Sequence, residues 1–96
     1  MPAATRQGDN CTGHDSCPAA PLVECSSDVI ISGRGAGRQG DHYSPHGCIV
    51  HSSHPDVIVG GSGTVFINGR PAARVGDGVS LGGTVAEGSG DVFIGG

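Results

Sequence analysis

One stretch of sequence recurs along the chain and decides the fold: residues 63–77 read GTVFINGRPAARVGD. Residues 27–41, SDVIISGRGAGRQGD, align with it without a gap. We call residues 27–41 the first copy and residues 63–77 the second copy. A third, split copy lies at the two ends of the chain, because residues 91–96 (DVFIGG) match the first half of the repeat and residues 2–9 (PAATRQGD) match its second half. Repetition of one short unit predicts a fold built from equivalent units.

Each copy is typical of a β-hairpin. The stretches 29–31, 65–67 and 92–94 consist of β-branched or aromatic residues and run into Ser-Gly, Asn-Gly or Gly-Gly. Such dipeptides supply the positive φ angles of tight two-residue turns. We therefore predict three hairpins, the third closed by the N- and C-terminal strands. That pairing would remove two unpaired strand edges and place both chain ends on one face.

Three Gly-Asp dipeptides end the three copies, at 8–9, 40–41 and 76–77. Glycine turns the chain there, and aspartate caps such a turn by accepting backbone N–H groups. Arg6, Arg38 and Arg74 stand two residues before each glycine, where they can pair with the aspartate. Because a catalytic arginine would not be needed three times, we interpret this pattern as structural.

The composition predicts a small all-β domain with a modest core. Gly and Pro account for 19 + 6 = 25 of the 96 residues, and the apolar content lies close to the level of disordered chains. Charged residues make up only 15%, however, which is low for a disordered chain. We expect one domain, 1–96, with no extension domain. A core this small needs an additional cross-link.

Several classes of function are disfavoured by the same composition. No apolar run approaches the roughly 20 residues of a membrane span, and the N-terminus lacks the apolar stretch of a signal peptide. A chain with five Arg, no Lys and a net charge of −4 lacks the basic surface of a nucleic-acid-binding protein. We expect a protein of the cytoplasm that neither binds nucleic acid nor inserts stably into membranes.

The second copy also resembles a known family. Pro71-Ala72-Ala73-Arg74, with VFING before it and VGD after it, is similar to the PAAR motif of the PAAR-repeat family, and residues 2–4 and 36–38 are weaker echoes. Members form the tips of type VI secretion systems and contractile phage tails. The resemblance implies a small all-β cone of three pseudo-threefold hairpin repeats. Its base would sit on a trimeric β-helical (VgrG-like) spike, and a metal ion, usually zinc, would lie near its apex.

The implied function is that of a non-enzymatic spike tip, one per spike trimer, that helps to pierce the target envelope. It would stay in the cytoplasm until assembly and then leave with the spike or form part of a virion tail; the sequence leaves both machines open. An adaptor that loads an effector protein onto the spike is an alternative. A small zinc hydrolase is disfavoured because Glu24 and Glu87 precede strands and are expected to lie away from the histidines, whereas catalytic zinc usually needs a nearby base.

The histidines indicate where a metal would bind. All five lie between positions 14 and 54, and a count of five residues past each Gly-Asp aspartate gives His14, His46 and Gly82. The family's site typically has three histidines and one cysteine. The third loop departs from the family's frequent Ser-Cys-Gly, because it reads Ser-Leu-Gly at 80–82.

We therefore predict a closed, structural zinc site, with iron or another transition metal as alternatives. Its ligands would be His14, His42, His46 and His51. Cys48 is the main substitute, Cys11 and Cys17 are less favoured ones, and His54 is taken as a bystander. Disulfides are the competing cross-link, but we expect reduced cysteines in the cytoplasm. Structural zinc would supply on the order of 10 kcal/mol to a small domain.

Overall fold

A computed structural model describes residues 1–13, 17–45 and 55–96, and these ranges contain no α-helix. Their regular elements are four short strands and one 3₁₀ turn: β1 (Ile30–Ile31), β2 (Arg34–Gly35), β3 (Phe66–Ile67), β4 (Arg70–Pro71) and η1 (Ser80–Gly82). β1 pairs with β2 and β3 with β4, both antiparallel. Isolated β-bridges hold much of the remaining described backbone, so the protein is nearly all-β, as predicted.

The first two hairpins turn where the sequence predicts. Ser32 and Gly33 have φ angles of 51° and 82°, and Asn68 and Gly69 have 55° and 77°. The strands have only two residues each, which is shorter than predicted. They end early because the returning chain leaves its own hairpin after β2 or β4 and pairs with a different copy.

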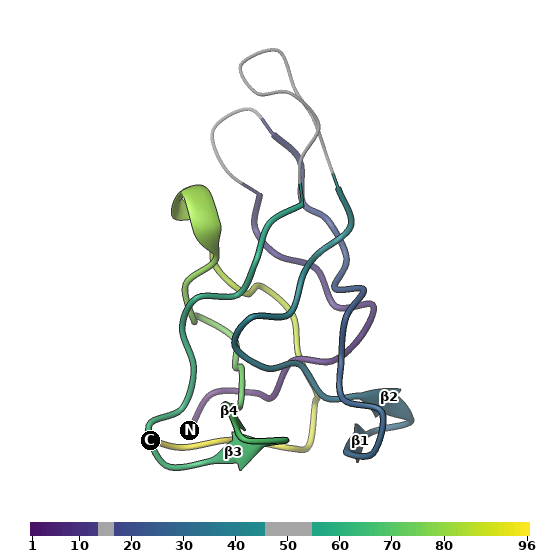
Figure 1. Cartoon of the computed structure of the whole chain (residues 1–96), viewed down its shortest axis with the longest axis vertical. Coiled ribbons are helices and arrows are strands. Elements are labelled where there is room, and N and C mark those ends of the chain that lie inside the picture. Colours follow the sequence, from purple (N-terminus) through teal and green to yellow (C-terminus); the bar gives the residue numbers. More distant parts are fainter. Residues whose placement is uncertain (14–16, 46–54) are drawn as a thin grey trace.

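The two ends of the chain pair with each other in the split copy. Ala3 and Phe93 form an antiparallel bridge, and the Ala4 amide donates to the Val92 carbonyl at 2.9 Å. The same hydrogen bond closes the other hairpins, from Ala36 to Val29 and from Ala72 to Val65, at 2.9 Å in both. Both chain ends consequently lie with the β3–β4 hairpin at one end of the molecule (Figure 1).

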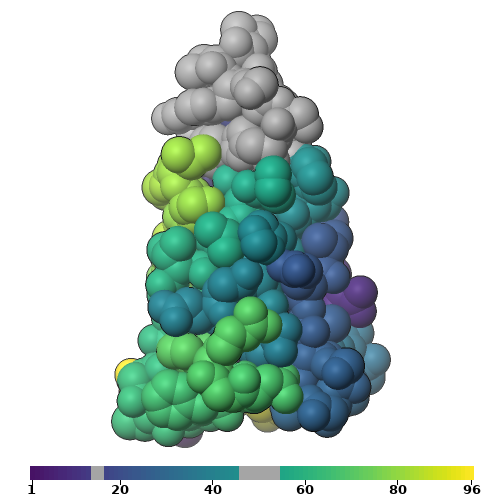
Figure 2. Space-filling view, viewed as in Figure 1, coloured from purple at the N-terminus to yellow at the C-terminus, as the bar shows by residue number. Residues whose placement is uncertain are grey.

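Three further bridges connect the copies in a closed cycle. Each places an arginine of one copy opposite an alanine of the next copy, and the pairs are Arg6↔Ala36, Arg38↔Ala72 and Arg74↔Ala4. All three alanines are completely buried. The described part is widest where the hairpins lie and narrows toward η1 (Figure 2). Small side chains at these positions let the three copies approach closely at the wide end.

The same arginines fix the Gly-Asp turns. In each copy the arginine donates to the aspartate three residues later from its backbone N (2.7–2.9 Å), its Nε (2.9–3.0 Å) and its Nη2 (2.9–3.2 Å). The predicted pairing and the predicted capping by the aspartate are both present. The aspartate side chains are 1–11% exposed, so solvent screens these ion pairs far less than surface pairs.

Two of the three aspartates receive a second arginine. Arg70 donates from Nη2 to Asp41 Oδ1 at 2.9 Å, and Nη1 of Arg34 lies 3.5 Å from Asp9 Oδ1. In the split copy, the residue equivalent to Arg34 and Arg70 is Pro2. Within the described ranges, Asp77 is therefore paired with Arg74 alone.

A buried serine fixes the chain just before each hairpin. The hydroxyl oxygen accepts hydrogen bonds from the amides two and three residues later at 2.9–3.3 Å, in the serines Ser26, Ser62 and Ser89. Their exposed fractions are only 1–2%. Each serine thereby satisfies two amides that the short strands leave without strand partners.

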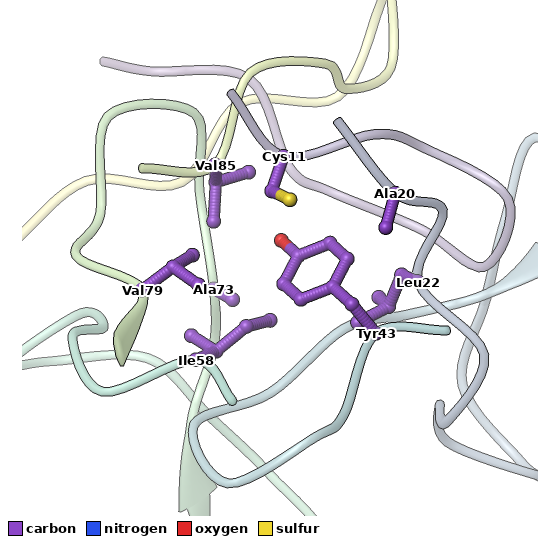
Figure 3. Close-up of a cluster of buried hydrophobic side chains, with 8 residues drawn as sticks. All are labelled: Cys11, Ala20, Leu22, Tyr43, Ile58, Ala73, Val79 and Val85. Carbon is purple, nitrogen blue, oxygen red and sulfur yellow. The ribbon is translucent and has the colours of Figure 1, made fainter. Parts of the chain in front are cut away.

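Two clusters of apolar side chains form the core. One packs between the hairpins and consists of Ala4, Ile31, Ala36, Ile67, Ala72 and Ile94. The other surrounds Tyr43 and consists of Cys11, Ala20, Leu22, Ile58, Ala73, Val79 and Val85 (Figure 3). The Tyr43 hydroxyl points toward Cys11, and burial raises the pKa of this phenol well above its ordinary value. It has no hydrogen-bond partner among the described residues.

We predict that Asp41→Ala destabilises the protein more than Asp77→Ala. Asp41 is 1% exposed and neutralises both Arg38 and Arg70, whereas Asp77 neutralises Arg74 alone. Removal of one partner from a buried ion pair costs about 3 kcal/mol or more. Urea denaturation would measure the two losses in free energy of unfolding. Equal losses would show that the second arginine contributes nothing.

We predict that Tyr43→Phe leaves the fold intact and raises the free energy of unfolding by up to about 1 kcal/mol. The substitution removes a buried hydroxyl that lacks a partner and keeps the ring that fills the core. Tyr43→Ala is the contrasting variant, and it should cost about 3 kcal/mol or more through the cavity it opens. A loss of more than about 1 kcal/mol in Tyr43→Phe would mean that the hydroxyl makes a stabilising bond.

Candidate functional site

Each of the three hairpins exposes a large apolar side chain at the same position of the repeat. These side chains are Ile30, Phe66 and Phe93, with exposed fractions of 58%, 58% and 50%, and we call them the hairpin face. The residue after each of them, Ile31, Ile67 or Ile94, is only 7–8% exposed and packs in the core. The exposure of the hairpin face is therefore imposed by strand alternation.

Polar contacts tie each hairpin turn to another copy. The Asn68 side-chain amide donates to Asp28 Oδ1 at 2.8 Å, and the Ser32 hydroxyl donates to Asp91 Oδ1 at 3.1 Å. In the split copy, the Gly95 carbonyl accepts from the Ser62 hydroxyl at 2.6 Å. The bond from Asn68 lowers the pKa of Asp28 below its ordinary value. These contacts hold the hairpins in fixed relative positions.

His42 is the one predicted metal ligand among the described residues, and it lies on the surface beside Glu24. The Glu24 carboxylate accepts from the His42 backbone N at 2.9 Å, and its Oε1 also contacts Nδ1 of the imidazole. The side-chain hydrogen bond to His42 lowers the pKa of Glu24. The expectation that Glu24 lies away from the histidines is therefore wrong. It fails because the chain before the first copy pairs with the chain after Asp41, a contact between distant residues.

The other predicted ligands, His14, His46 and His51, lie outside the described residues, as do Cys48 and His54. Within the described ranges, no group of three metal-binding side chains comes together. An imidazole that donates its Nδ1–H to a carboxylate keeps the lone pair of Nε2 for a metal ion. This is the usual arrangement of a metal-binding histidine. His42 thus fits the chemistry of a zinc ligand.

The cysteines differ from the expectation of a fully reduced set. Cys17 is disulfide-bonded, whereas Cys11 and Cys25 are free thiols. Cys11 is 1% exposed and packs near Tyr43 in the core. Cys17 in a disulfide offers no thiolate to a metal ion, and Cys11 is buried in the core.

The described part of the chain offers no enclosed site for a small substrate. No pocket is present in it, and no helix among the described residues is long and apolar enough to cross a membrane. The exposed hairpin face is a surface feature that sequence reasoning missed. The signal was available in the alternation of VFI and VII, in which the middle residue must point away from its buried neighbour.

Comparison with known proteins gives one match, to part of the chain. No curated protein matches the chain in sequence. A family model described as the PAAR motif matches residues 51–96, which include the second copy with Pro71-Ala72-Ala73-Arg74 and the C-terminal half of the split copy. This match supports a PAAR-repeat family protein.

Proposed function

We propose that the protein is the tip of the spike of a contractile injection machine. In this proposal, three pseudo-threefold hairpin repeats form a cone whose wide end caps a trimeric β-helical, VgrG-like spike, one tip per trimer. The narrow end leads when the spike is driven into the target envelope. The protein would be made in the cytoplasm and leave with the spike.

The observation that carries the proposal is the closed cycle of the Arg6↔Ala36, Arg38↔Ala72 and Arg74↔Ala4 bridges. A partner with three identical chains needs a monomeric tip that offers each chain a similar surface. The cycle supports such a match, because its three bridges link the three copies at equivalent positions within one chain. Both chain ends lie at the same wide end (Figure 1).

The family points in the same direction. The PAAR motif is associated with spike-tip proteins of type VI secretion and is structural rather than enzymatic. In the described part of the chain, Glu24 contacts the exposed His42 on the surface. We therefore propose a mechanical function and no catalysed reaction.

We further propose that His14, His42, His46 and His51 hold a structural zinc ion. Bound zinc would cross-link the loops that carry these residues. Glu24 would serve the site by orienting the His42 ring and fixing its tautomer, as carboxylates do for metal-binding histidines. The polar contacts between the hairpin turns and the other copies at the wide end, together with a metal ion at the other end, would compensate for the small core.

The spike assignment predicts a complex of one tip and one spike trimer. Mixing the protein with its cognate trimeric spike and analysing the mixture by native mass spectrometry should give a 1:3 assembly. A spike trimer from which the terminal β-helical turns have been deleted is the control and should remain free. If the intact trimer and the tip do not associate, the spike-tip proposal is wrong.

The zinc assignment predicts one metal ion per chain, measured by elemental analysis. A chelator should lower the midpoint of thermal unfolding by more than about 10 °C. His42→Ala should lose zinc affinity. Asn10→Ala, at the equivalent position of the split copy, should keep it, because the bonds between Asn10 and its glutamate, Glu87, use backbone atoms of Asn10. Destabilisation by a reductant but not by a chelator would instead identify the disulfide as the essential cross-link.

A further inference from the structure

A symmetric partner can use a contact three times only where the three hairpins agree. All three carry a valine, then an exposed apolar residue, then a buried isoleucine, in the stretches 29–31, 65–67 and 92–94. The valines are themselves intermediate or exposed. The apolar hairpin face is thus common to all three copies, and its members have nearly the same exposed fraction.

The polar groups around the hairpins differ between copies. Arg34 and Arg70 occupy a position that is Pro2 in the split copy, and both already pair with aspartates of the same chain. Likewise, Asp28 and Asp91 have Thr64 as their third equivalent, and both aspartates bond to side chains of the same chain. These groups stabilise the tip and offer no contact that three identical partner chains could share.

We infer that Ile30, Phe66 and Phe93 determine the specificity of the tip for its spike, each entering an apolar pocket on one of three identical chains. This inference rests on the proposed function. Identical chains carry identical pockets, and two of the three pockets hold phenylalanine, so every pocket has room for a phenylalanine. Ile30 therefore leaves its pocket partly unfilled.

The unequal filling gives an unusual expectation for substitutions. Large apolar residues buried at the centre of an interface supply most of its binding energy, so truncation of Phe66 or Phe93 should be costly. Enlargement of Ile30 should do the opposite, because a phenylalanine there would bury additional apolar area in an existing pocket. The free tip should tolerate all these changes, since the three side chains are at least half exposed.

The test is the affinity of purified variants for the cognate spike trimer, measured by biolayer interferometry. Phe66→Ala and Phe93→Ala should each weaken binding about tenfold or more, and Ile30→Phe should tighten it about threefold. Val59 provides matched controls. Val59 is 52% exposed but lies outside the hairpins, where its backbone amide donates a hydrogen bond to the Gly78 carbonyl. Val59→Ala and Val59→Phe should therefore leave the affinity unchanged. Thermal unfolding would verify that every variant is folded.

The outcomes separate this inference from the spike assignment. If the unsubstituted tip does not bind the trimer, the proposed function itself is wrong, and the inference fails with it. If the tip binds but Phe66→Ala and Phe93→Ala match it in affinity, the hairpin face is not the contact. If Ile30→Phe weakens binding, or Val59→Phe tightens it as much as Ile30→Phe does, the three pockets are not equivalent apolar sites. Each of these results with a tip that binds the trimer overturns the inference and leaves the spike assignment standing.

Discussion

The ion pair between an arginine and the aspartate three residues later is the contact on which the structure depends. Its aspartate accepts from the arginine backbone as well as from the side chain, so one carboxylate fixes both a turn and the direction of the strand before it. The backbone of that same arginine bridges to an alanine of the next copy. A local turn and the long-range closure are therefore set by the same residue, and the protein needs only a small core.

Residues that fix the backbone repeat among the copies, and so do the alanines and isoleucines of the core between the hairpins. The core residues at the Tyr43 position differ from copy to copy. The position two residues after the aspartate is Cys11, Tyr43 or Val79, and the three side chains pack in one cluster. A large ring from one copy fills the space that two smaller side chains leave at the centre (Figure 3). Unlike side chains at this position fill the cluster with one large ring and two smaller groups.

The sequence predicted those parts of the fold that depend on neighbouring residues. Ser32-Gly33 and Asn68-Gly69 adopt positive φ as expected, and the Arg–Asp spacing of three residues gave the ion pairs, because both are local effects. The contact of Glu24 with His42 was missed, since it depends on a bridge between chain segments 18 residues apart. The hairpin face was missed for a related reason, because exposure is decided by which neighbour packs in the core.

The split copy is the hairpin whose two strands are not joined by a turn, and we call the pairing of these strands the seam. The first two hairpins are closed by covalent turns, but the third is held by hydrogen bonds such as that from Ile94 to Pro2 and by the Gly95 contacts with Ser62 and Arg74. A force that separates the ends would open this hairpin first, because no peptide bond spans it. The seam lies at the wide end of the molecule, which the proposed function places against the spike. Contact with a trimeric spike would then cover the pairing between the two chain ends, which is the hairpin that lacks a covalent turn.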